Sequence, residues 1–282
     1  LYSSAASDVY KRQLCVISSI SFIVSAKENK EYTSDNFLSV ADGIIAWKKA
    51  DNGSEPDGYL INDKYLENAG TTPGDWYPIA LGRLGIQDNN EGYLAVIKDR
   101  VEERYRESGR LSAAKATEWH RIALAVLAMG GDPTNFGTDE NGAPINLIAD
   151  GTYDRGKTTP LGRQGINGWI WGLITLDSMR YTVPDGAYNT RDDIIVEIIS
   201  KQLSDGGFAL SSDDADPDIT AMAITALAPY YNSEKIYSYH RKALSADESK
   251  TVHEVVDEAV LCLSRLQLDT GDYKSWGTQN VE

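Results

Sequence analysis

Four apolar segments along the chain follow one pattern and can be laid over one another. They read DWYPIALGRLG from Asp75, EWHRIALAVLAMG from Glu118, NGWIWGLITLDS from Asn167 and DITAMAITALAPY from Asp218. In each, a small residue follows the opening position by five residues and a leucine follows it by nine; the small residues are Ala80, Ala123, Gly172 and Ala223. The segments start 43, 49 and 51 residues apart, and self-similarity at such a period is typical of repeat proteins. The shared small residue predicts a close approach between helices at that position.

Amphipathic stretches of a second kind lie between these segments. Their apolar residues keep helical spacing on one face and occur at Phe37, Val40, Ala41, Ile44 and Ile45, at Leu94, Ile97, Val101 and Tyr105, at Ile194, Ile195, Ile198 and Ile199, and at Val252, Val255, Val256, Ala259, Val260 and Leu263. A helix that is apolar on most sides belongs inside a protein, whereas a one-sided helix belongs at its surface. No run of alternating residues predicts a strand convincingly, so we expect an all-α fold of repeated inner–outer hairpins. Such hairpins stack as an open solenoid or close as a ring.

A seven-residue motif follows two of the one-sided stretches. Gln202, Gly206 and Phe208 have the same spacing as Gln267, Gly271 and Tyr273, so both copies read Q-x-x-x-G-x-aromatic. The glycine allows a left-handed turn after a helix. The glutamine amide can bind backbone groups of a neighbouring helix end, and the aromatic ring can cover that joint.

This motif resembles the Q-x-x-x-G-x-W repeat of the terpenoid cyclase and protein prenyltransferase superfamily. The resemblance covers roughly residues 35–282 and implies an α/α toroid, a ring of inner helices inside a ring of outer ones. GINGWIWGLITLDS and ADPDITAMAITALAPYY are most similar to the toroid domain of bacterial surface proteins related to the cobalamin carriers intrinsic factor and transcobalamin. In those relatives the toroid is a binding domain, which implies a small-molecule ligand (a corrinoid among the options) or a surface partner.

The catalytic motifs of the superfamily are incomplete in this chain. Squalene-type cyclases protonate their substrate with D-x-D-D, and this chain has Asp213-Asp214-Ala215-Asp216-Pro217-Asp218 instead. Prenyltransferases bind zinc through D-x-C, where this chain has Asp218-Ile219-Thr220, and a hydroxyl is a poor zinc ligand. We therefore expect a non-catalytic binding domain, with no catalytic residues. An enzyme of this superfamily and a structural spacer module are the alternatives.

The acidic cluster itself allows two interpretations. Asp213, Asp214 and Asp216 could bind calcium, because closely spaced carboxylates are ligands for hard cations. A solvated loop whose last aspartate caps a helix is the interpretation that we favour.

The candidate ligand-binding residues lie at the starts of the four apolar segments, except Tyr188, which lies between the third and the fourth. The polar ones are Asp75, Glu118, His120, Asn167, Asp218 and Thr220, and the aromatic ones are Trp76, Trp119, Trp169, Trp171 and Tyr188. In a toroid, these helix starts would rim one mouth of a central cavity and the rings would form flat apolar walls. The alternatives are helix caps for the polar residues, core packing for the rings, and a hydrogen-bonded structural histidine for His120.

Charge and cysteine content restrict the partners. The chain carries 27 Lys and Arg against 42 Asp and Glu, a net charge of −15, which repels phosphate backbones and argues against nucleic acid. Its cysteines are Cys15 and Cys262, and it contains neither CxxC nor HExxH. We expect no disulfide framework, no metal and no cofactor.

The N-terminal region predicts export. Residues 14–24, LCVISSISFIV, follow Lys11 and Arg12 and precede small residues, which is the pattern of a secretory signal cleaved after Ala26. The run is too short to span a bilayer, so we expect a secreted or cell-surface protein without stable membrane insertion. A buried helix or strand is the alternative. Residues 1–13 resemble translated sequencing-adapter sequence, and we exclude them from the predicted fold.

The expected division is therefore residues 1–26, adapter-like tract and signal, and residues 27–282, toroid domain. In the resembled family the second motif leads into another inner helix, and Glu282 aligns with Asp218. We expect a toroid truncated at its C-terminus, without its closing hairpins.

Overall fold

The computed structural model describes residues 34–154, 160–275 and 278–280. Its helices are α2 (Ser34–Asn52), α3 (Asp63–Leu66), α4 (Thr72–Leu84), α5 (Asn90–Ser108), α6 (Thr117–Ala128), α7 (Leu147–Gly151), α8 (Ile166–Asp177), α9 (Arg191–Ile199), α10 (Pro217–Leu227) and α11 (Val252–Leu266). Short 3-10 turns are η1 (Leu161–Gln164), η2 (Ala228–Tyr230) and η3 (Lys242–Leu244). The strands are β1 (Ile236–Arg241), β2 (Ala246–Thr251), β3 (Tyr273–Ser275) and β4 (Thr278–Asn280). The predicted signal, its cleavage after Ala26 and the adapter-like tract lie outside the described residues.

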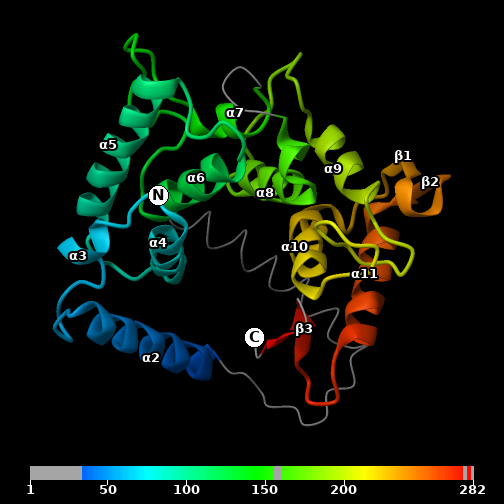
Figure 1. The fold of residues 1–282 in the computed structure, drawn as a ribbon, viewed down its shortest axis with the longest axis horizontal. Coiled ribbons are helices and arrows are strands. Elements are labelled where there is room, and N and C mark those ends of the chain that lie inside the picture. Colours follow the sequence, from blue (N-terminus) through cyan, green and yellow to red (C-terminus); the bar gives the residue numbers. More distant parts are fainter. Residues whose placement is uncertain (1–33, 155–159, 276–277, 281–282) are drawn as a thin grey trace.

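The four matched segments form α4, α6, α8 and α10, and these helices pack in succession. α4 packs on α6, α6 on α8 and α8 on α10, while α9 covers α8 and α11 covers α10. Figure 1 shows the four as a curved row, with α5, α9 and α11 on its outer side. The sequence pattern therefore predicts both the helices and their order. The chain is mostly helical, as expected.

The outer helices use their predicted faces. Ile194, Ile195, Ile198 and Ile199 of α9 are all 0% exposed. Both α9 and α11 begin with a capping box, in which Thr190 pairs with Asp193 and Thr251 pairs with Glu254. Reciprocal bonds of this kind satisfy free N–H groups in the first turn, so the start of each helix is specified locally.

The closest approach between α4 and α6 differs from the prediction. Ala80 is exposed, whereas a Cβ on Gly82 would lie 2.0 Å from the Ala128 backbone oxygen. Gly82 is therefore the residue that lets these helices touch. Ala123 and Ala223 are buried as expected, and a Cβ on Gly172 would make only ordinary contacts.

The expectation of an all-α fold is wrong in one respect, because the described residues include two antiparallel hairpins. β1 and β2 pair from Ile236 with Thr251 to Arg241 with Ala246, between α10 and α11, and β3 pairs with β4. In β1 the buried residues Tyr237, Tyr239 and Arg241 alternate with exposed ones. This is the period-two pattern of a strand, but its buried members are amphipathic or charged, so a search for alternating aliphatic residues misses it.

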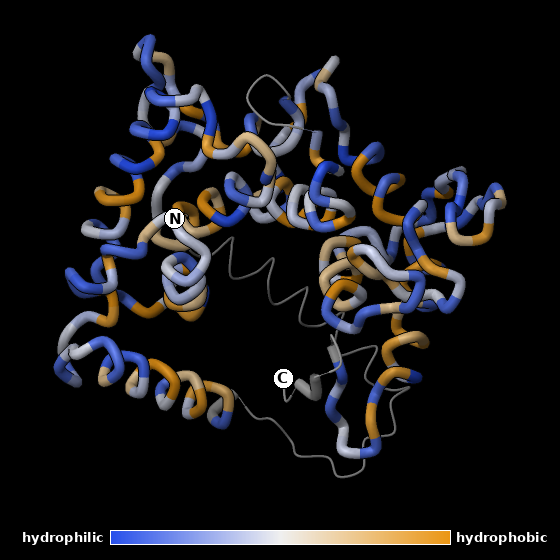
Figure 2. Tube along the Cα trace, in the orientation of Figure 1, coloured by the Kyte–Doolittle hydropathy of each residue, from blue (hydrophilic) through white to orange (hydrophobic). Residues whose placement is uncertain are grey.

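Helix α2 forms where it is expected, but its apolar face is not buried. Phe37 is 59%, Val40 60% and Ile44 50% exposed, while Ile45 packs against the core. Figure 2 shows apolar segments recurring along α2. The described elements leave this face uncovered. Across the residues that the structure describes, no helix has the length and apolar character needed to cross a bilayer.

Candidate functional site

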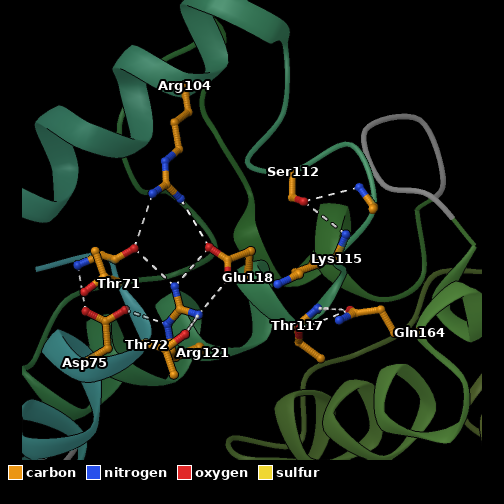
Figure 3. Close-up of polar contacts among 12 residues, drawn as sticks. Thr71, Thr72, Asp75, Arg104, Ser112, Lys115, Thr117, Glu118, Arg121 and Gln164 are labelled. Carbon is orange, nitrogen blue, oxygen red and sulfur yellow. Dashed lines mark hydrogen bonds and ion pairs between the residues drawn. The ribbon is translucent and has the colours of Figure 1, made fainter.

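The start of α4 holds a buried ionic network (Figure 3). Asp75 is 0% exposed; its Oδ2 accepts from the Arg121 Nε at 2.8 Å, and its Oδ1 accepts from the Tyr93 hydroxyl and the Gly70 amide, each at 2.7 Å. Arg121 also donates to Glu118 at 2.7 Å. Burial raises the pKa of the Asp75 carboxyl, and the bonds from Arg121 and Tyr93 oppose that effect.

Glu118 completes the network at the surface side. Its carboxylate lies between Arg121 and Arg104, with an Arg104 Nη1 to Oε2 distance of 3.4 Å. Burial works to raise the pKa of Glu118, but the two guanidinium groups lower it overall. Asp75 therefore ties α4 to α6 through Arg121, which Glu118 binds from the same helix as Arg121, and Asp75 presents no free carboxylate to a ligand.

Two residues expected to contact ligand lie in the core instead. Trp119 is 0% exposed and its Nε1 donates to the Tyr105 hydroxyl at 2.8 Å. Thr220 is also 0% exposed; its hydroxyl accepts from the Phe208 amide at 2.9 Å and donates to the Phe208 carbonyl oxygen at 3.1 Å. Their polar atoms are used internally, so neither residue offers a surface to a ligand.

His120 is buried between α6 and α7. Its Nε2 lies 2.7 Å from the Gly151 carbonyl oxygen, so this nitrogen carries the proton and donates it. Its Nδ1 has no hydrogen-bond partner among the described residues. Burial lowers the pKa of His120 to about 4. These contacts favour the structural histidine over the cavity-lining donor.

Acidification is expected to destabilise the folded protein through protonation of the buried His120. The pKa of His120 rises from about 4 in the folded protein to its ordinary value near 6.5 on unfolding. The contribution of the neutral His120 ring to the free energy of unfolding is therefore fully present above pH 6.5 and is lost as the pH falls through 4. Urea titrations at pH 7 and pH 4 measure how much the free energy of unfolding falls between these two pH values. In His120→Gln this fall should be smaller by about 3 kcal/mol than in the unchanged protein. His240→Gln, at an exposed ring, is the control; equal effects of the two substitutions would contradict the assignment.

At the remaining helix starts, the predicted residues Asp218 and Asn167 do not act as caps. Asp216, and not Asp218, caps α10, since its Oδ1 accepts from the Ile219 amide at 3.0 Å. Asp218 is exposed, and Asn167 is half-buried with an Oδ1 that has no partner among the described residues. Asp213 and Asp214 lie in an exposed loop. Within the described ranges, no group of three or more His, Cys, Asp or Glu residues is arranged to hold a metal ion.

The two Q-x-x-x-G-x-aromatic motifs have one geometry. The Gln202 amide donates to the Gly206 oxygen at 2.8 Å, and the Gln267 amide donates to the Gly271 oxygen at 2.9 Å. The glycines have φ values of +89° and +92°. Gln202 makes a second bond, to the Val255 oxygen of α11 at 2.9 Å, which joins the end of α9 to the next outer helix.

The aromatic rings of the two motif copies differ in burial. Phe208 is 0% exposed, whereas Tyr273 is only partly buried. The motif therefore shapes the turn in both places but seals a joint only at the first.

Of the predicted aromatic walls, the structure brings two together. Trp76 of α4 and Trp171 of α8 have ring centroids 5.5 Å apart with an interplanar angle of 55°. Trp169 lies elsewhere, with the Lys201 ammonium 5.9 Å from its ring, and Tyr188 is 68% exposed. Since α4 and α8 both pack on α6, their rings meet across one side of α6.

A pocket opens beside Trp76, between the end of α2, α3 and the start of α4. It has a volume of about 430 Å³ and is lined by Lys48, Asn52, Tyr65, Asn68, Pro73, Trp76 and Tyr77. The described lining contains no carboxylate, histidine or cysteine, and its titratable side chains are those of Lys48, Tyr65 and Tyr77. Aromatic faces with a few polar side chains are typical of a binding pocket.

Most of this lining was not predicted from the sequence. Only Trp76 was among the candidates; Lys48, Asn52, Tyr65, Asn68 and Tyr77 were not. A signal exists in the segment YLINDKYLENAGTTPGDWY, residues 59–77, which is dense in aromatic and amide residues. No family model, curated protein or solved structure matched this chain, so the function of the pocket is argued from its geometry.

Proposed function

We propose that this chain is a non-catalytic ligand-binding domain of an exported protein, built as an α/α toroid. The contact between Trp76 and Trp171 carries the proposal. Trp76 is on α4 and Trp171 is on α8, and α6 lies between these helices in the curved row. Their rings can meet on the inner side of the row, because neighbouring helices diverge on its outer side. An aromatic surface on the inner side, with Trp76 42% exposed, suits the binding of a small molecule.

The resemblance to cobalamin-carrier toroids supports this proposal and adds a corrinoid to the ligands to be tested. The enzyme alternative has weaker support. An acid catalyst needs a carboxyl group that faces its substrate, but Asp75 is held by Arg121 and Tyr93. Asp213, Asp214 and Asp218 are exposed to water. A spacer module would not need paired tryptophans on an inner face. Export remains a prediction from residues 14–26.

Equilibrium dialysis against cyanocobalamin and neutral oligosaccharides tests this function. We expect saturable binding of one ligand class, weakened about tenfold by Trp171→Ala because an aromatic contact is lost. Trp47→Ala is the matched control, since Trp47 is 62% exposed on α2 and takes no part in the contact between Trp76 and Trp171. Failure of the stably folded protein to bind either class would contradict the proposal. Turnover of squalene or a prenyl diphosphate would favour the enzyme alternative.

A further inference from the structure

We infer that the pocket between α2, α3 and α4 binds a neutral carbohydrate, with one sugar ring stacked on the aromatic surface formed by Trp76 and Tyr77. This inference rests on the proposed binding function and specifies its ligand. Three properties of the lining carry it: its flat apolar surfaces, its uncommitted amide groups and its local charge balance.

The apolar surfaces have the shape that a sugar ring needs. Pyranose rings carry axial C–H groups on a face, and these groups pack on the negative face of an aromatic ring. Trp76 is 42% exposed and lies next to Pro73 and Tyr77 in the lining. Tyr65 is 4% exposed and meets the Tyr77 ring edge-to-face, with centroids 6.4 Å apart and an angle of 88°. The buried tyrosine therefore fixes the orientation of its neighbour before a ligand arrives.

The amide groups offer both donors and acceptors. The Asn52 Nδ2 donates to the Leu60 carbonyl oxygen at 2.9 Å, which orients the side chain, while its Oδ1 accepts no hydrogen bond from the described residues. The Asn68 side chain makes no hydrogen bond to the described residues and is exposed at the pocket. Sugar hydroxyls donate and accept at once, and a planar amide matches that requirement.

The charge balance favours an uncharged ligand. Lys48 is the one charged residue of the described lining, and its ammonium lies 2.6 Å from an Asp51 carboxylate oxygen. The pair is neutral overall, and the net charge of −15 on the chain opposes an anion. A cation is disfavoured as well, because the Lys48 ammonium already lies 5.7 Å from the Tyr77 ring centroid.

Size and surroundings fit an oligosaccharide better than a single sugar. The volume of about 430 Å³ lies within the usual range of about 300–1,000 Å³ for small-molecule sites. Trp171 touches Trp76 and extends the aromatic surface beyond the pocket lining. A second sugar unit can therefore continue from Trp76 towards Trp171.

Isothermal titration calorimetry with maltotriose, cellotriose and chitotriose tests the inference, with cyanocobalamin as a separate arm. We expect one trisaccharide to bind with a Kd below about 1 mM. Trp76→Ala should weaken it at least about tenfold, and Asn68→Ala about fivefold through the loss of hydrogen bonds. Trp47→Ala should change the Kd less than about twofold. Trp47 is adjacent to Lys48 in the sequence, but it is not part of the pocket lining. Circular dichroism checks that each variant is folded.

Each outcome separates the two proposals. Binding of a trisaccharide that is lost in Trp76→Ala and Asn68→Ala supports the inference. Binding of cyanocobalamin alone overturns the carbohydrate assignment and leaves the proposed function intact. Trisaccharide binding that both substitutions leave unchanged assigns the ligand to another surface and overturns this site. Absence of binding in every arm overturns the inference and the proposed function together.

Discussion

Asp75→Asn is expected to lower the free energy of unfolding by about 3–5 kcal/mol, the range measured when one partner of a buried ion pair is removed. Asp75 is 0% exposed and Arg121 has 7% of its side chain exposed, so little water can replace the lost carboxylate. The substitution also leaves the Tyr93 hydroxyl with a weaker acceptor in the core. Urea denaturation followed by circular dichroism at pH 7 measures the effect.

A surface ion pair provides the control for Asp75→Asn. Glu197 near the end of α9 binds Lys201, four residues later in the chain, at 2.5 Å, but 42% of the Glu197 side chain is exposed. Glu197→Gln should therefore cost about 0.5 kcal/mol or less, because water screens the pair. If both substitutions have the same small cost, the Asp75 network does not hold α4 against α6.

Gly206→Ala is expected to cause the second largest loss of stability, after Asp75→Asn, and the repeat supplies its own control. Gly206 has φ +89°, and a Cβ at this position would lie 2.7 Å from the Glu258 carbonyl oxygen in α11. The backbone conformation costs an L-residue about 1–2 kcal/mol. Forcing the turn away from α11 costs about 1–3 kcal/mol more.

Gly271→Ala separates these two contributions. Gly271 occupies the same motif position with φ +92°, but a Cβ there meets no atom within 4 Å among the described residues. Only the backbone cost of about 1–2 kcal/mol should remain. The difference between the two variants, measured by chemical denaturation, reports the contact with α11. Equal losses of stability would mean that this contact is relieved without cost.

Local patterns along the chain predict the helical part of the fold well. Four isoleucines of α9 that share one face in the sequence are all buried, because helical periodicity alone decides which side chains share a face. The geometry of the Gln202 motif is also local: the turn, the glycine conformation and the amide bond to Gly206 lie within five residues. The bond from Gln202 to Val255 and the bonds between Phe208 and Thr220 depend on more distant segments.

Long-range pairings set the limit of prediction from this sequence. Arg121 lies three residues after Glu118, so their pairing on one helix is readable. Its bond to Asp75 depends on how closely α4 approaches α6, which Gly82 decides. The pocket is harder still, because Lys48 and Asn68 reach it only through the packing of α2 and α3.

The succession of α4, α6, α8 and α10 has a consequence for how the protein opens. Each of these helices packs on its neighbours in the row, and α8 and α10 pack also on α9 and α11, so none of the described elements packs extensively on all four. Repeat-like proteins of this kind can lose structure at one end while the other end stays intact. Hydrogen bonds near the uncovered face of α2 should therefore exchange with solvent under milder conditions than those of α8. A ligand held against α2 and α4 would slow this fraying selectively at that end of the row.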